Sequence, residues 1–138
     1  MRLTSFTDYG LRMLMRMASA PGRAFSTTEL ADEFKLSRHH LTKIMQRLAR
    51  AGIVETRRGV GGGAALAKPA QEIRLGDLVM LLEDGQPLVE CFMPGASACT
   101  IEGACRLKTR LRRAETVFLD DLNRSTLADI ALPEPATA

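Results

Sequence analysis

The sequence predicts a mainly α-helical protein with a winged helix-turn-helix domain and a long C-terminal dimerisation helix. Three observations lead to this fold class: two closely spaced amphipathic helices between residues 26 and 52, a glycine-rich hairpin directly after them, and an apolar repeat over residues 104–123. A chain of 138 residues has room for one domain and an appended element that needs a partner.

The first helix is expected to begin after Thr4 and Ser5. Apolar residues then recur at helical spacing, among them Met13 and Met17, until the Pro-Gly pair at 21–22 ends the segment. Methionine at this spacing is typical of core positions, so we expect both side chains to be buried.

Two capping serines predict the helix-turn-helix. Ser26 is followed by Glu29 at capping-box spacing, and the short helix that begins there ends near Lys35. Ser37 starts a longer helix that ends before Gly52. The apolar stripe of this longer helix follows the i, i+3, i+4, i+7 pattern and consists of Leu41, Ile44, Met45 and Leu48.

The face opposite that stripe carries side chains that suit a DNA major groove. Gln and Arg make bidentate contacts to base edges, Thr can meet a thymine methyl group, and Lys or Arg pairs with phosphates. The alternative for a single basic helix is a solvated surface. Arg50 shares this face, and the candidate DNA contacts on the helix are Arg38, His39, Thr42, Lys43, Gln46 and Arg47.

The segment after the helix favours the DNA interpretation. Short strands at 53–56 and 64–66 are joined by a glycine-rich turn that bears Arg57 and Arg58, which is the pattern of a wing whose arginines reach the adjacent minor groove or its phosphates. The glycines also resemble a phosphate-cradling loop, but no Lys-Ser/Thr follows them and no helix begins there. A further short helix at 75–82 is expected to cover the domain core.

Charge is distributed unevenly along the chain. Residues 1–70 hold 12 Lys/Arg against 5 Asp/Glu, which gives +7, whereas residues 71–138 hold 7 against 11, which gives −4. The basic half is therefore a candidate binder of polyanions. Neither a signal peptide nor an 18-residue apolar run is present in the sequence, so we expect a cytoplasmic protein without a membrane segment.

The segment from residue 104 to 123 predicts a long helix with a narrow apolar seam. A small domain cannot cover such a seam by itself, so pairing with the same helix of a second subunit is expected, which would space two recognition helices by about one DNA turn. The alternative is that the seam packs on the first helix of its own chain. The seam consists of Leu107, Leu111, Ala114, Phe118 and Leu122.

All three cysteines lie in one loop, as Cys91, Cys99 and Cys105. Unreactive free thiols or a disulfide would be unusual there, because buried cysteines scatter through hydrophobic elements and disulfides are rare in the cytoplasm. Zinc sites normally use closely spaced cysteine pairs, which this loop lacks, whereas widely spaced thiolates suit an iron–sulfur cluster. Catalysis by a cysteine nucleophile is disfavoured because both histidines, His39 and His40, lie on the recognition helix. We therefore do not expect an enzyme.

These features together resemble the iron–sulfur winged-helix repressors, the family that includes the cluster-biogenesis regulator IscR and the nitric-oxide-sensing repressor NsrR. The resemblance extends from "LTSFTDYGLRMLM" through "SRHHLTKIMQRLARAGIVETRRGVGGG" and "LVECF" to "CTIEGACRLK" and "STLADI". It implies a homodimeric transcription factor that binds a double-stranded DNA operator, with its cluster held by Cys91, Cys99 and Cys105.

The fourth cluster ligand separates the branches of that family. The IscR branch has a histidine three residues after its last cysteine, and this sequence has Lys108 there. "FTDYG" and "LVECF" resemble the NsrR branch, which implies Asp8 of the partner subunit as the oxygen ligand; Glu90, Glu102 or an external ligand are alternatives. The resemblance thus implies a repressor that carries a 4Fe-4S cluster, or alternatively a 2Fe-2S cluster, and releases DNA in response to nitric oxide.

The expected division of the chain follows. Residues 1–84 form the winged helix-turn-helix DNA-binding domain, 85–105 the cluster-binding loop, 104–131 the dimerisation helix and a short terminal helix, and 132–138 a flexible tail. Two other functions stay open at this point: a related regulator that senses iron, cluster supply or redox state, and a zinc- or thiol-based DNA-binding module.

Overall fold

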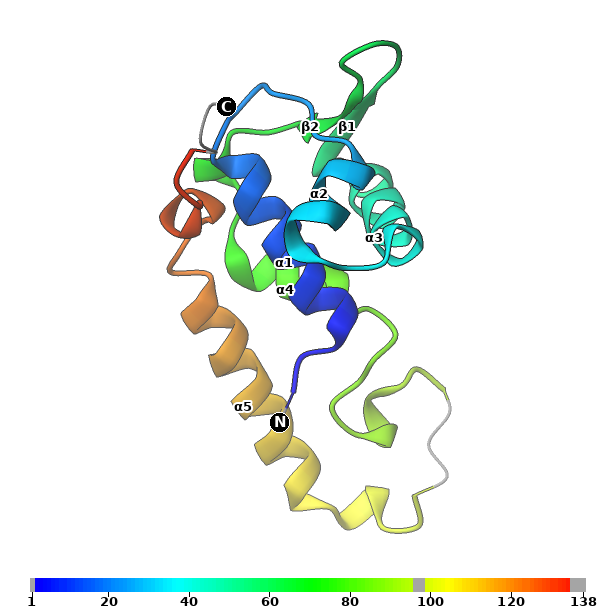
Figure 1. Ribbon diagram of the computed structural model, residues 1–138. Helices are drawn as coiled ribbons and strands as arrows, with labels where there is room; N and C mark the ends of the chain where they lie inside the picture. Colours follow the sequence, from blue (N-terminus) through cyan, green and yellow to red (C-terminus); the bar gives the residue numbers. More distant parts are fainter. Residues whose placement is uncertain (1, 96–98, 135–138) are drawn as a thin grey trace.

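The computed structural model describes residues 2–95 and 99–134, and it confirms the predicted fold class (Figure 1). Five α-helices and one antiparallel hairpin make up the described chain, with short 3-10 turns between and after them. The helices are α1 (Ser5–Ala18), α2 (Thr27–Phe34), α3 (Arg38–Arg50), α4 (Leu75–Leu82) and α5 (Arg106–Leu122). The strands are β1 (Val54–Arg57) and β2 (Gly63–Leu66), and the 3-10 turns are Ala70–Glu72, Glu90–Phe92, Glu102–Ala104 and Leu127–Ile130.

The first three helices begin where the sequence predicts. The hydroxyls of Thr4, Ser26 and Ser37 each accept a hydrogen bond from the backbone N–H three residues later, at 3.2, 3.0 and 3.3 Å respectively. Each bond satisfies one of the N–H groups that have no partner inside the helix. Lys35 ends α2 in the left-handed conformation, with φ of 56°, and so allows the tight turn into α3.

A single apolar core joins α1, α2, α3 and α4. The stripe predicted on α3 is buried, as are Met13 and Met17 of α1, because these positions face inward at helical spacing. Helix α4 covers this core as expected. The largest fully buried apolar side chains of the core are Phe25, Met13, Leu14, Met17, Leu30, Leu41, Ile44, Leu48, Leu78, Leu82 and Leu127.

The wing hairpin is pinned to the loop before α2. Phe25 and Ala64 exchange two backbone hydrogen bonds of 2.8 Å, which extend the hairpin by one bridge. Gly63 makes this approach possible, because a Cβ at that position would lie 2.4 Å from the carbonyl oxygen of Phe25. The first strand begins one residue later than expected, since the N–H of Ile53 still bonds to Leu48 O of α3 at 3.0 Å.

Helix α5 packs mainly on α4. Its last turn meets the first turn of α4, where Asn123 Oδ1 accepts the Asp77 N–H at 3.0 Å and Arg74 donates to Asn123 O at 2.8 Å. From there α5 extends away from the domain, and the cysteine loop lies at its far end (Figure 1). The helix starts at Arg106 instead of residue 104, because Cys105 is extended and Glu102–Ala104 forms a separate 3-10 turn.

The end of the described chain returns to α1. The Leu132 N–H bonds to Met15 O at 3.1 Å, and Arg16 donates to Pro133 O at 2.7 Å. The start of the segment expected as a flexible tail is therefore held in place, and residues 135–138 lie outside the described part. Nowhere in residues 2–95 and 99–134 does a helix combine the length and hydrophobicity that crossing a bilayer requires.

Candidate nucleic-acid interface and cysteine loop

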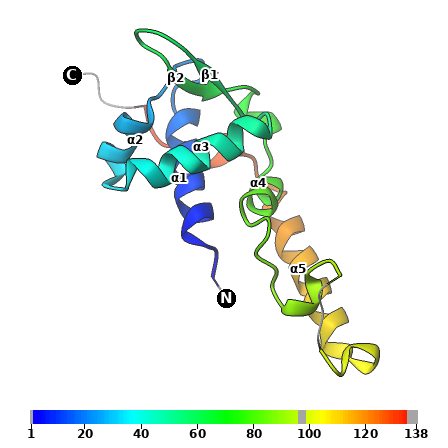
Figure 2. The ribbon, with the colours of Figure 1, turned by 90° about the vertical axis from the view of Figure 1, so that its right-hand side faces the viewer.

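Helix α3 presents one open face beside the wing. Figure 2 looks onto this helix, with α2 next to its N-terminal end and the β1–β2 hairpin along its side. The candidate contacts Arg38, His39, Lys43 and Gln46 are exposed there, as is Arg50. Thr42 is half-buried, and its hydroxyl donates to Arg38 O at 2.9 Å, which leaves its methyl group as the part available to a base.

A hollow runs along this face between α2, α3 and β1. Gln46 and Arg50 stand at it with two residues that the sequence reasoning missed, Thr27 of α2 and Thr56 of β1. Only the tertiary fold brings these threonines next to α3, and their positions at the start of a helix and inside a strand gave no separate signal. The complete lining is Thr27, Thr42, Met45, Gln46, Ala49, Arg50 and Thr56.

Three of the candidate arginines have contacts within the chain, the weakest being that of Arg38, whose Nη1 donates to Thr28 Oγ1 at 3.5 Å. The Arg47 guanidinium lies over the Phe6 ring, 4.4 Å from its centroid, and donates to Leu82 O at 3.3 Å. Arg57 donates to Gly22 O at 2.7 Å. Arg58 is exposed on the hairpin, and the structure shows no hydrogen bond or ion pair from its side chain to the described residues.

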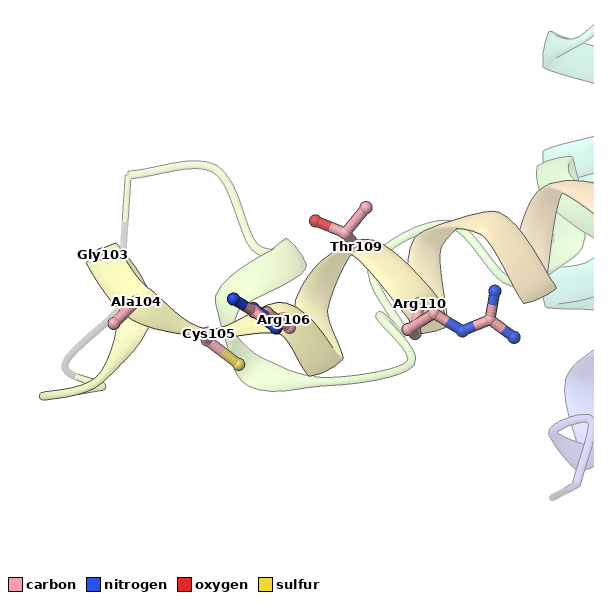
Figure 3. Close-up of a pocket in the computed structure, with 6 residues that line it drawn as sticks. All are labelled: Gly103, Ala104, Cys105, Arg106, Thr109 and Arg110. Carbon is pink, nitrogen blue, oxygen red and sulfur yellow. The ribbon is translucent and has the colours of Figure 1, made fainter.

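The cysteine loop is fastened to the first turns of α5. Arg112 lies over the Phe92 ring, 4.0 Å from its centroid, and this contact holds the turn that contains Cys91 against the helix. Cys105 is the residue directly before α5, and Figure 3 shows its sulfur beside Arg106. A shallow hollow surrounds it, lined by Gly103, Ala104, Cys105, Arg106, Thr109 and Arg110. Cys91 and Cys105 are half-buried, and Cys99 is exposed.

Lys108 occupies the position where the IscR branch has its histidine. Its ammonium bonds to Glu102 Oε1 at 2.5 Å, and this hydrogen bond, with the negative charges of Glu102 and Cys91, raises the pKa of Lys108 above 10.5. At neutral pH the nitrogen is therefore protonated and has no lone pair to offer a metal.

Thiolates at Cys91, Cys99 and Cys105 are donors that suit iron or zinc. In the part of the chain that the structure describes, however, no three potential metal ligands come together. Asp8, the expected fourth ligand, forms a bidentate ion pair with Arg12 at 3.1 and 2.8 Å. The donor chemistry of the three thiolates thus fits an iron–sulfur cluster.

Comparison with known proteins extends over nearly the whole chain. A family model described as Rrf2, iron-dependent transcriptional regulator, matches residues 3–132. The oxidised form of CymR from Staphylococcus aureus is similar with a TM-score of 0.73 and 29% identity, over 99% of this chain and 100% of that one. CymR from B. subtilis, described as the global cysteine regulator, gives 0.69 and 29%, over 95% and 96% of the two chains.

The IscR of T. potens shares the fold, with a TM-score of 0.72 at 24% identity over 94% of this chain and 85% of that one. Members of this family are transcriptional regulators and not enzymes, in agreement with the expectation from the sequence. The open face of α3 and the adjacent wing are the surfaces that a DNA-binding regulator requires. Because the family model spans residues 3–132, this chain belongs to the Rrf2 family of DNA-binding transcriptional regulators.

Proposed function

We propose that this protein is a repressor whose affinity for its operator depends on a bound iron–sulfur cluster and that nitric oxide is its effector. The observation that supports this most is the cysteine loop, because Cys91 and Cys105 are both held at the free end of α5, the helix proposed to pair two subunits. The iron dependence in the description of the family supports the same function. Such a regulator acts where DNA is, and we place it in the cytoplasm.

In this proposal Cys91, Cys99 and Cys105 hold a 4Fe-4S cluster, or alternatively a 2Fe-2S cluster, and Asp8 of the partner subunit completes the site. When bound, the cluster supplies iron that reacts with nitric oxide. Within the chain, Asp8 must exchange its ion pair with Arg12 for this role. The loop would then connect two subunits, so that cluster occupancy and DNA affinity influence each other by the same factor.

Anaerobic purification tests the proposal. We expect brown protein with iron and acid-labile sulfide, and an operator duplex, selected from random sequences, whose Kd rises at least about 10-fold after treatment with nitric oxide. Replacing Cys99 by Ser should remove the colour and weaken binding, because one thiolate ligand is lost. Oxygen-protected protein that lacks iron and sulfide and still binds the operator at full strength would exclude the cluster.

A second function is favoured by the similarity to the CymR proteins, one of them described as the global cysteine regulator and another solved in an oxidised form. Under this alternative the thiols themselves respond to cysteine supply or oxidation, with zinc or no metal bound. Metal-free protein, or protein with one zinc per chain, whose DNA binding changes on thiol oxidation would support it. The remaining alternative is a regulator of iron or redox state. It would be indicated if the protein contains a cluster and its DNA binding responds to iron depletion or oxidants but not to nitric oxide.

A further inference from the structure

The N-terminal part of α1 covers one side of α3. The His40 ring lies 5.3 Å from the Tyr9 ring in an edge-on arrangement and 6.1 Å from Phe6. Two helical turns further along, the guanidinium of Arg47 lies 4.4 Å from the Phe6 centroid. All four side chains are half-buried, so this flank is held at two points along its length.

Arg47 also joins α3 to the end of α4. Its Nη1 donates to Leu82 O at 3.3 Å, and this carbonyl is one of those that a helix leaves without an internal partner at its C-terminus. The next residue, Glu83, accepts the Thr4 N–H at 2.7 Å, and its other carboxylate oxygen is buried without a hydrogen-bond partner among the described residues. Arg47 therefore places a positive charge at a junction of α1, α3 and α4 that also contains a partly buried carboxylate.

We infer that Arg47 is a positioning residue for DNA recognition and does not contact a phosphate. By fixing the flank of α3 against Phe6 and Leu82, it sets the rotation of the helix about its own axis. That rotation determines whether Lys43 and Gln46 face the major groove, and base contacts tolerate little misalignment. The inference rests only on the DNA-binding part of the proposed function, so it holds whether or not a cluster is bound.

The test compares Arg47→Met with Lys43→Met, which removes the same charge from the exposed face of the same helix. A lost phosphate contact lowers the slope of log K against log salt by about 0.9, and we expect this loss only for Lys43→Met. For Arg47→Met we expect an unchanged slope, about a 10-fold loss of affinity for the selected operator, and unchanged affinity for a scrambled duplex. A merely unstable protein would lose both affinities together, and thermal melts confirm that each variant is folded at the assay temperature.

Phe6→Leu supplies a second measurement that leaves every charge in place. If Arg47 acts through the ring, this variant shows the same selective loss, and adding Arg47→Met to it has little further effect. Arg47→Lys, which keeps a cation over the ring, should restore part of the affinity. A slope reduced by about 0.9 in Arg47→Met would show that Arg47 contacts a phosphate. An unchanged ratio of operator affinity to scrambled-duplex affinity would show that Arg47 has no positioning role. Either result overturns the inference.

Discussion

At the scale of single residues, neighbours in the sequence have different environments. Arg57 and Arg58 are both exposed on the hairpin, but Arg57 Nη1 donates to Gly22 O at 2.7 Å and its Nη2 lies 3.4 Å from Glu55 Oε1, whereas the Arg58 side chain has no such contact with the described residues. A side chain that already has partners gives up those contacts when it binds a phosphate. Arg58 has less to give up and is the stronger candidate for a wing contact.

We predict that Arg58→Ala weakens operator binding and lowers the salt slope by about 0.9, as the loss of one phosphate contact requires. Arg57→Ala should weaken binding by a second route as well, because it releases the hairpin from the loop before α2. Fluorescence anisotropy over a series of salt concentrations measures both effects. Unchanged affinity in the double variant would show that the wing does not contact DNA.

At the scale of elements, the joint between α4 and α5 depends on a close approach. Gly76 lies in the first turn of α4, and a Cβ there would lie 2.3 Å from Leu119 O and 2.6 Å from Asn123 Oδ1. The backbone of α5 cannot move away without breaking the bond between Asn123 and the Asp77 N–H. Glycine is thus required by packing, although its φ is not in the left-handed region.

Gly76→Ala should therefore destabilise the protein by roughly 1–3 kcal/mol, the usual cost of overpacking. Alanine normally favours helices over glycine, so the sign of the effect itself tests the contact. Gly103→Ala is the matched control, because its Cβ would meet no atom within 4 Å. Urea unfolding of the two variants measures the difference, and equal midpoints would contradict the packing of α5 on α4.

At the scale of the whole molecule, α5 leaves its apolar seam largely open. None of the helix residues described here is buried, and Leu107 is 61% exposed. A second copy of the chain is the partner that we propose for this surface, because closed two-fold pairing covers the same patch on both subunits. The same pairing would give each cysteine loop access to the first helix of the partner.

Leu107→Asp should convert the proposed dimer to monomer, since a charge would enter the paired surface. Val117 provides a control on the same helix: it is 60% exposed but points about 100° away from the seam. Val117→Asp should leave the dimer intact. Light scattering of metal-free protein gives the masses, and a wild-type chain that is monomeric at all concentrations would contradict pairing through α5.

Local features could be predicted well from the sequence. The capping hydroxyls, the buried stripe of α3 and the extent of α4 depend on residues within a few positions of one another, and the structure confirms them. The candidate DNA face was predicted less completely. A helical projection places Arg47 beside Lys43, but it cannot show that Phe6 and Leu82 occupy the space next to it.

The sequence by itself determined the fold class, the recognition helix and the concentration of all three thiols in one loop, because periodicity, capping and composition act over short distances. Only the tertiary structure decided which cations are exposed, which glycine lets two helices meet, and that Cys91 and Cys105 lie at the same end of α5. Those outcomes depend on contacts between residues far apart in the chain. A one-dimensional pattern carries no information about them until the core has brought the elements together.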